Sequence, residues 1–317
     1  HDESLDLSLD EIIITAGSSG GLDSILRLFT SPGDTVLVEA PSYHEALALI
    51  RDHPVQIQQV ATDAQGPIIE SFEHQIHWAK RKKSAPVLFY TIPVFQNPSG
   101  VTWSLKRREE ILTLSRQHDV TLIEDDVYRD LYYSSPPPPS LFTLDDTRRQ
   151  VLRLGSFSKI LSPGLRLGWL LGPANSLERI TNCGLLSSGG GVNPFAAQVA
   201  NEFCRKGWMP EHVHTLCNQY GSRYRVMLAA LNEFMPPDVT WNEPSGGFFI
   251  WLTLPEGVSS SVILEQTLKE GVAFLSGHHF FATGGGERNI RLPFSYVQPE
   301  DMRYAIEVLG QVIRANL

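Results

Sequence analysis

The run Gly155-Ser-Phe-Ser-Lys-Ile-Leu-Ser-Pro-Gly-Leu-Arg-Leu-Gly-Trp169 is the most informative part of this sequence. It places Lys159 between hydroxyl side chains and seven positions before Arg166. Ser156, Ser158 and Arg166 offer charge-assisted hydrogen bonds that suit a phosphate dianion. A lysine amine held beside that phosphate is able to form a Schiff base with an aldehyde. The run therefore predicts a site for a phosphate-bearing aldehyde cofactor, and the alternative is a surface loop with an ordinary lysine.

The bulk composition indicates an ordinary globular protein. The chain has 317 residues, of which 42% are hydrophobic and 19% are charged, which is enough for one large core and a smaller domain. Its net charge of -9 comes from 35 acidic and 26 basic residues, without a long basic run. That balance argues against a nucleic-acid-binding surface, so we expect no nucleic-acid partner.

Cysteine content and hydropathy bear on the compartment. Cys183, Cys204 and Cys217 are an odd number without CxxC spacing, which suggests neither a disulfide framework nor a zinc site and fits a reducing compartment. The apolar run at residues 86–95 is far shorter than the ~20 residues that span a bilayer. Residues 1–10 are acidic and lack the features of a signal peptide. We therefore expect a cytoplasmic protein with no membrane partner.

Short apolar runs alternate with amphipathic stretches in the first part of the chain. Runs that are apolar throughout indicate strands covered on both faces. The pattern predicts an α/β fold, with a mostly parallel sheet and helices on both of its faces. The expected strands cover residues 12–15, 35–39, 87–90, 121–124, 151–154 and 167–171. The expected helices cover residues 21–30, 44–51, 104–118 and 175–183, with Ser104 as an N-cap.

The pattern changes after Pro194. Long helices are expected over residues 195–205 and 212–234, followed by strand-like runs at 247–252, 273–275 and 289–292. We therefore predict two domains. Residues 1–234 form a large cofactor-binding α/β domain that ends in a long connecting helix. Residues 235–317 form a smaller C-terminal α+β domain.

A turn of small residues follows the first expected strand. The segment Ile14-Thr-Ala-Gly-Ser-Ser-Gly-Gly-Leu22 runs from that strand into a helix. The backbone N–H groups of Ser18, Ser19 and Gly20 would converge where the helix dipole is positive, which favours an anion such as phosphate. A plain helix N-cap is the alternative for this turn.

A carboxylate, Asp125, begins the sequence Asp-Asp-Val-Tyr128 at the end of a buried strand. An unpaired carboxylate in that place is costly, so Asp125 requires a cationic partner. A metal site built with Glu124 and Asp126 is the rival interpretation. No further ligand lies at a suitable spacing, and we therefore expect no metal.

These features resemble the class I and II aminotransferases, which are fold-type I enzymes that use pyridoxal 5′-phosphate. The resemblance depends on positions that follow the family's order over most of the chain: the turn at Ser18, Tyr43, Asn97 in Gln96-Asn-Pro-Ser-Gly100, Asp125, Tyr128, Ser156, Lys159, Arg166 and Arg291. Within the family, residues 124–128 and 156–169 look most similar to the 2-aminoadipate and kynurenine aminotransferases. They are also similar to the aminotransferase-like domain of MocR-type regulators.

The resemblance implies three catalytic residues. Lys159 would carry the cofactor as a Schiff base and, once freed, act as the general base at the substrate Cα. Asp125 would keep the pyridine nitrogen protonated, which makes the ring an electron sink. Tyr128 would hydrogen-bond the phenolic oxygen of the cofactor.

The remaining positions would bind the cofactor and the substrate. Tyr43 is expected to stack on the pyridine ring, and Asn97 to donate to the phenolic oxygen. The expected phosphate-binding residues are Ser18, Ser19, Gly20, Ser156, Ser158 and Arg166. Arg291 and Asn97 are expected to clamp the substrate carboxylate. Without the resemblance, Tyr43 fits a packed aromatic residue at a strand end, and Arg291 fits a surface charge.

The resemblance implies transfer of an amino group from an L-amino acid, with a preference for aromatic or 2-aminoadipate-like side chains, to a 2-oxo acid such as 2-oxoglutarate. It also implies a homodimer, in which Ser188-Gly-Gly-Gly191 lies near the partner's phosphate, although a flexible loop fits this segment equally well. Two alternatives stay open: a ligand-sensing domain of a transcription regulator, and a lyase or racemase on the same fold.

The sequence departs from the family in two places. Relatives often carry a glutamine where this chain has Ser19 or Gly20. Family members also have a leading segment before the first expected strand, whereas this chain starts almost at that strand. We expect that the leader is truncated, is not included, or is absent from a diverged protein with an open site.

Overall fold

The computed structural model describes residues 5–82, 84 and 86–317, and its larger β-sheet occupies the first half of the chain. The strands of this sheet are β1 (Ile12–Thr15), β2 (Thr35–Ala40), β3 (Gln56–Asp63), β4 (Gly66–Pro67), β5 (Pro86–Thr91), β6 (Thr121–Asp125), β7 (Val151–Ser156) and β8 (Gly168–Leu171). Their order is β1-β8-β7-β6-β5-β2-β3-β4. The neighbouring pairs β7–β6, β6–β5, β5–β2 and β2–β3 are parallel. β8 is antiparallel to both β7 and β1. The predicted fold class is confirmed.

Helices cover both faces of this sheet, because successive residues of a buried strand point to opposite sides. Val36 and Val38 of β2 belong to the hydrophobic cluster on one face, and Leu37 belongs to the cluster on the other. The first face is covered by α1 (Gly17–Phe29), α2 (His44–Arg51) and α6 (Ala174–Thr181), and the second by α3 (Ile69–Arg81), α4 (Leu105–His118) and α5 (Leu141–Leu144).

The carboxyl ends of the parallel strands meet at one edge of the sheet, and ligands of open α/β sheets bind at such edges. β1 ends at this edge as well. It is antiparallel to β8, which is antiparallel to β7, so β1 and β7 run in the same direction. The amino end of β8 lies at the same edge for the same reason. Segments far apart in the sequence are thereby brought together.

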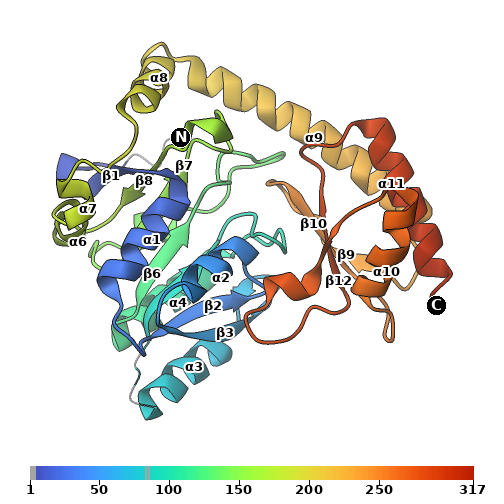
Figure 1. The fold of residues 1–317 in the computed structure, drawn as a ribbon, viewed down its shortest axis with the longest axis horizontal. Helices are drawn as coiled ribbons and strands as arrows, with labels where there is room; N and C mark the ends of the chain where they lie inside the picture. The colour runs from blue at the N-terminus through green and yellow to red at the C-terminus, as the bar shows by residue number, and fades with distance from the viewer. Residues whose placement is uncertain (1–4, 83, 85) are drawn as a thin grey trace.

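A smaller antiparallel sheet, with the order β11-β12-β10-β9, forms the C-terminal part. Its strands are β9 (Thr240–Trp241), β10 (Phe249–Thr253), β11 (Leu275–Ser276) and β12 (Asn289–Pro293), and the helices of this half of the chain are α7 (Gly184–Ser187), α8 (Pro194–Arg205), α9 (Trp208–Phe234), α10 (Ser260–Thr267) and α11 (Pro299–Arg314). Figure 1 shows α9 running along the top of the molecule from the large sheet to the small one, with α11 packed beside its end. Met227 and Leu231 of α9 contribute to the core of the smaller part.

Several bounds differ from those that the sequence predicts. The sequence does not predict β3 or α3. α1 begins at Gly17 instead of residue 21, so Ser18, Ser19 and Gly20 lie in the first turn of the helix and not before it. The strand expected over residues 273–275 instead covers Leu275–Ser276, so only Leu275 is common to both ranges. The division of the chain between residues 234 and 235 stays a prediction.

The length of α9, 27 residues, is sufficient for a bilayer span. The helix is too polar for that environment, and no helix in the described parts of the chain is both long and apolar enough to cross a membrane.

Candidate active site

A cavity of about 170 Å³ lies where the strand ends meet. It is lined by most of the residues that the sequence predicts for the site: Ser18, Ser19, Tyr43, Asn97, Asp125, Tyr128, Ser156, Ser158, Lys159 and Arg166. Ile92, Val127 and Pro163 complete the lining. Gly20 and Arg291 are not part of this lining. Gly20 lies in the first turn of α1, and Arg291 contacts Asn97.

Asp125, at the end of β6, is a buried carboxylate in the cavity. It is 5% exposed, and its Oδ2 accepts a hydrogen bond of 2.7 Å from the Tyr90 hydroxyl. Its Oδ1 is buried and has no hydrogen-bond partner among the described residues. Burial raises the pKa of Asp125 to about 6, against the lowering effects of the Tyr90 hydrogen bond and of Lys159. Such an oxygen is costly unless a ligand brings the missing donor.

Lys159 lies in the turn that follows β7. Its Nζ is 6.0 Å from the centre of the Tyr128 ring. Burial lowers the pKa of Lys159; the negative charge of Asp125 opposes this shift, and the positive charges of Arg166 and Arg291 add to it. A lowered pKa favours the neutral amine, which is the form that acts as nucleophile or base.

Another part of the cavity suits an anion. The N–H group of Ser18 lies in the first turn of α1, where the helix dipole is positive. Gly17 has a φ of 73°, and a Cβ at this position would lie 3.1 Å from Nη2 of Arg166. The glycine therefore lets the guanidinium lie against the helix start. Ser156 and Ser158 line the same cavity, with the Ser158 N–H donating to the Ser156 hydroxyl at 3.1 Å.

Arg291 approaches the cavity from the second sheet. It lies on β12, opposite Trp251 of β10. Its Nη1 donates to Oδ1 of Asn97 at 2.9 Å. The guanidinium carbon is 4.3 Å from the centre of the Phe249 ring and 5.0 Å from that of Phe280. The buried Nε has no hydrogen-bond partner among the described residues. An arginine fixed by two rings, with an unused donor, is suited to bind a carboxylate.

Two tyrosines border the cavity between these groups. Tyr43 comes directly before α2, and Tyr128, which is 4% exposed, follows β6. Burial raises the pKa of both hydroxyls, and an Asn97 hydrogen bond lowers that of Tyr128. Both hydroxyls are therefore protonated at neutral pH. Stacking of Tyr43 on a cofactor ring stays a prediction.

Tyr90 is a residue of the site that the sequence analysis does not identify. It is fully buried on β5, and its hydroxyl holds Oδ2 of Asp125. Burial and the Asp125 charge raise the pKa of Tyr90 well above its ordinary value, so the hydroxyl remains a donor. The available signal is a tyrosine in an otherwise apolar strand, because a buried tyrosine hydroxyl usually has a partner.

Glu124 and Asp126 are not part of the cavity lining. Glu124 accepts hydrogen bonds of 2.8 and 3.0 Å from the first two backbone N–H groups of α5, on the other face of the sheet. Asp126 forms ion pairs with Arg129 and Arg153. Within the described ranges, no group of three or more His, Cys, Asp or Glu side chains is arranged to hold a metal ion. The three consecutive acidic residues thus have separate partners, which argues against a metal site.

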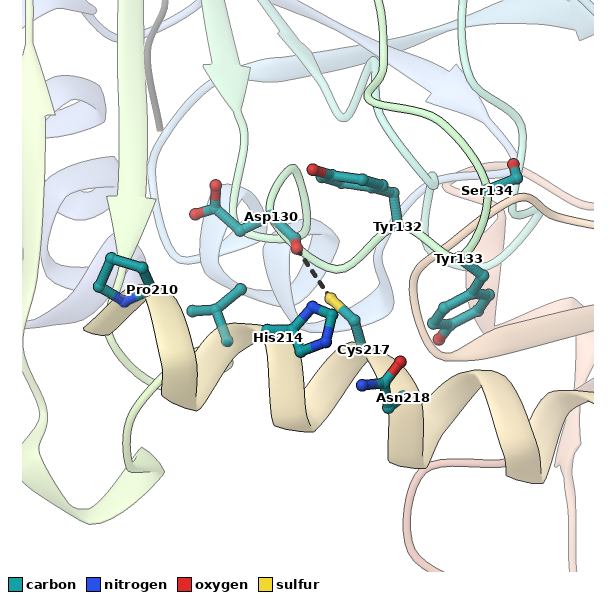
Figure 2. Close-up of a pocket in the computed structure, with 9 residues that line it drawn as sticks. Asp130, Tyr132, Tyr133, Ser134, Pro210, His214, Cys217 and Asn218 are labelled. Carbon is teal, nitrogen blue, oxygen red and sulfur yellow. Dashed lines mark hydrogen bonds between the residues drawn. The ribbon is translucent and has the colours of Figure 1, made fainter. Parts of the chain in front are cut away.

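A second cavity, of about 330 Å³, lies between the first half of α9 and the loop at residues 130–134. Figure 2 shows Cys217 of α9 donating through Sγ to the backbone oxygen of Asp130, with His214 and Asn218 on the same helix. The lining contains none of the residues predicted for the site. The smaller cavity is therefore the better candidate, because it brings Lys159, Asp125 and Arg166 together.

Known proteins are similar to this chain over nearly its whole length. A sequence profile of the family described as aminotransferase class I and II matches residues 1–309. The chain belongs to this family. The aromatic-amino-acid aminotransferase 1 of Thermococcus litoralis is 36% identical to this aminotransferase over 311 residues, which is 98% of the chain and 74% of that protein. The 2-aminoadipate transaminase of Thermus thermophilus is 33% identical over 312 residues, which is 97% of the chain and 76% of that protein.

A solved structure agrees with these sequence matches. The kynurenine aminotransferase of Pyrococcus horikoshii, crystallised in complex with PMP, superposes with a TM-score of 0.93 at 38% identity. The match covers 98% of this aminotransferase and 77% of that chain. The predicted family, fold and enzyme class are confirmed.

Class I and II aminotransferases use pyridoxal 5′-phosphate, and the residues of this aminotransferase fit that cofactor. Oδ1 of Asp125, for which residues 5–82, 84 and 86–317 offer no partner, suits a protonated ring nitrogen. The amine of Lys159, with its lowered pKa, suits an aldehyde. The start of α1 and Arg166, which lie together because residue 17 is glycine, suit a phosphate.

Proposed function

We propose that this aminotransferase moves the amino group of an aromatic or 2-aminoadipate-like L-amino acid to a 2-oxo acid such as 2-oxoglutarate. The observation that supports the proposal most strongly is the buried Oδ1 of Asp125, which has no partner among the residues that the structure describes and lies in the same cavity as Lys159 and Arg166. The names of the T. litoralis and T. thermophilus relatives support the choice of amino acid.

The proposal gives the cavity residues separate tasks at the cofactor. Asp125 would hold the protonated ring nitrogen of the cofactor, and Tyr90 keeps the carboxylate in place. When bound, pyridoxal phosphate supplies an electron sink for the substrate carbon. Lys159 holds the cofactor first and afterwards takes the proton from the substrate Cα, which requires the neutral amine that its lowered pKa favours. Arg166 and the start of α1 bind the phosphate.

Arg291 and Asn97 orient the substrate through its carboxylate. Nη1 of Arg291 already donates to Asn97, whereas Nε has no partner in the described part of the chain. The ring centres of Phe249 and Phe280 lie 4.3 and 5.0 Å from the guanidinium carbon, so the position of the guanidinium is restricted before the substrate arrives. A carboxylate held in this way keeps the substrate Cα at a set position relative to Lys159.

We also propose that the protein is cytoplasmic and that each chain has a large domain of residues 1–234 and a small domain of residues 235–317.

A homodimer is part of the proposal as well. Large apolar side chains are exposed on α8 and at the start of α9: Phe195 is 77% exposed, Val199 41% and Trp208 51%. Apolar groups exposed in this way indicate a contact surface. Light scattering during size-exclusion chromatography tests the dimer, and Phe195→Ser should weaken it.

A product analysis tests the reaction. Purified protein loaded with pyridoxal phosphate is incubated with 2-oxoglutarate and either L-phenylalanine or L-2-aminoadipate. We expect glutamate and the matching 2-oxo acid, formed with ping-pong kinetics. Release of ammonia would favour a lyase, and loss of optical activity without a new acid would favour a racemase. A spectral change on binding without any product would favour a ligand-sensing domain.

A further inference from the structure

Glu39 is a buried carboxylate to which the proposed reaction gives no task. It is the second-last residue of β2, and it is 1% exposed. Burial raises the pKa of Glu39 to about 7, and the hydrogen bonds that it accepts only partly offset this effect. A buried group of this kind is costly, so a specific role is expected for it.

Three donors to Glu39 lie on one segment. Its Oε2 accepts from the backbone N–H of Ile92 at 3.0 Å and from Nε2 of Gln96 at 3.5 Å. Its Oε1 accepts from the indole N–H of Trp103 at 3.1 Å. The three donors lie at the start, the middle and the end of residues 92–103. This segment, named the Asn97 segment here, carries the residue that contacts Arg291.

Gln96 extends these contacts to the segment before α2. Its Nε2 donates to the backbone oxygen of Pro41 at 2.7 Å. Its Oε1 accepts from the backbone N–H and the hydroxyl of Ser99, at 2.8 and 2.7 Å. Pro41 lies two residues before Tyr43. Glu39 and Gln96 thus join the Asn97 segment to the segment that carries Tyr43.

Ser99 continues the connection to the second sheet. Its backbone oxygen accepts a hydrogen bond of 2.5 Å from Nδ2 of Asn242. Oδ1 of Asn242 accepts from the backbone N–H of Trp251 at 2.7 Å. Trp251 lies directly opposite Arg291 in the β10–β12 pair. One series of hydrogen bonds therefore runs from Glu39, through the Asn97 segment, to the strand pair that carries Arg291.

We propose that Glu39 is a positioning residue, which fixes the Asn97 segment against both the Tyr43 segment and the second sheet and thereby sets the grip on the substrate carboxylate. This inference depends on the proposed function, because it names a support for the same site. Glu39 itself is not part of the cavity lining. Because the residues predicted to bind the phosphate lie on α1 and at or after the end of β7, loss of Glu39 should affect substrate binding more than cofactor binding.

Glu39→Gln is the main test variant, and Asp145→Asn is its matched control. The glutamine keeps one acceptor oxygen but places an amide NH₂ opposite a donor, so one buried contact is lost. Asp145 is also 1% exposed, and it accepts backbone N–H groups of Arg149 and Gln150 at 3.0 and 2.8 Å. It precedes β7 and so lies at the other end of the sheet. Gln96→Ala is a second test variant, in case Glu39→Gln does not fold.

Hydrogen exchange of the cofactor-free protein is the first measurement. At a pH above 7, where Glu39 is mostly ionised, amides of residues 92–103 should exchange about tenfold faster or more in Glu39→Gln and Gln96→Ala, because a hydrogen bond to a charged group contributes at least that factor. They should exchange as in the natural protein in Asp145→Asn. Unchanged exchange of residues 92–103 in both test variants would overturn the proposal.

Kinetics of the cofactor-loaded protein are the second measurement. In the two test variants, KM for L-phenylalanine and for 2-oxoglutarate should rise about tenfold, with a smaller change in kcat and in the Kd for pyridoxal phosphate. If KM and cofactor affinity instead change only as much as in Asp145→Asn, Glu39 is merely structural and the proposal fails. A natural protein without transaminase activity would overturn the proposed function. The exchange measurement, which needs no turnover, would still decide whether Glu39 fixes the segment.

Discussion

Replacement of Asp125 by asparagine should stabilise the cofactor-free protein at neutral pH. Asp125 is 5% exposed, and burial raises its pKa from 3.8 to about 6. The difference between these two values corresponds to about 3 kcal/mol of folding free energy, at about 1.4 kcal/mol for each pH unit. Asparagine keeps the shape of the side chain and an acceptor for the Tyr90 hydroxyl, but it cannot ionise.

The direction of this pH effect depends on whether the folded or the unfolded protein releases the Asp125 proton at the lower pH. In the unfolded chain Asp125 ionises near its ordinary pKa of 3.8, whereas the folded protein keeps the proton until about pH 6. Rising pH between these values therefore favours unfolding of the natural protein. The asparagine variant does not lose stability in this way, because its side chain cannot ionise. Its free energy of unfolding, relative to that of the natural protein, should rise by about 3 kcal/mol across this window and stay level on either side.

Urea unfolding at a series of pH values, followed by tryptophan fluorescence, measures this difference. Comparison across pH cancels any constant effect of the substitution itself. A difference that does not change with pH, or that falls as pH rises, would refute the view that Asp125 is a desolvated carboxylate. With pyridoxal phosphate bound, the natural protein should gain more stability than the variant, because the cofactor supplies the donor that Oδ1 lacks.

Three further substitutions separate the tasks of the site. Tyr90→Phe removes a hydrogen bond that lowers the pKa of Asp125, so the upper end of the pH range in which the cofactor-free protein loses stability should move up by about one to two pH units; an unmoved range would show that Tyr90 does not affect this pKa. Arg291→Ala should raise KM for amino acid and 2-oxo acid about thirtyfold or more while the cofactor is retained on gel filtration. Loss of the cofactor from this variant would contradict its assignment to the substrate. Arg166→Ala should do the reverse and weaken cofactor retention more than it raises KM, which equilibrium dialysis would detect.

Much of the large sheet was predictable because its strands are apolar throughout. The run at residues 35–39 became β2, and Ser104 caps α4 by accepting from the Arg107 N–H at 3.2 Å. β3 does not follow that rule. Its sequence contains three glutamines, and most of its side chains are at least partly exposed because β4 is its short outer neighbour. In α3, Phe72, Ile76 and Ala79 are buried at helical spacing, so the signal was present in the sequence.

The sequence was sufficient to predict most of the residues that line the cavity, but not the contacts between them. The order of lysine, aspartate, asparagine and arginine positions indicated which residues meet, and the strand ends bring most of them to one cavity. The bond between Arg291 and Asn97 joins residues 194 positions apart and depends on how the second sheet packs. The partners of Tyr90 and Glu39 depend likewise on neighbouring strands and loops. Such contacts are set by tertiary packing, which local sequence patterns do not encode.

The most direct test of the account is the site of cofactor attachment. The protein is loaded with pyridoxal phosphate, reduced with sodium borohydride, digested and analysed by peptide mass spectrometry. We expect the pyridoxyl group on Nζ of Lys159 and no labelled peptide from Lys159→Ala. A label on a different lysine of the natural protein, or an undiminished label in the variant, would contradict the account.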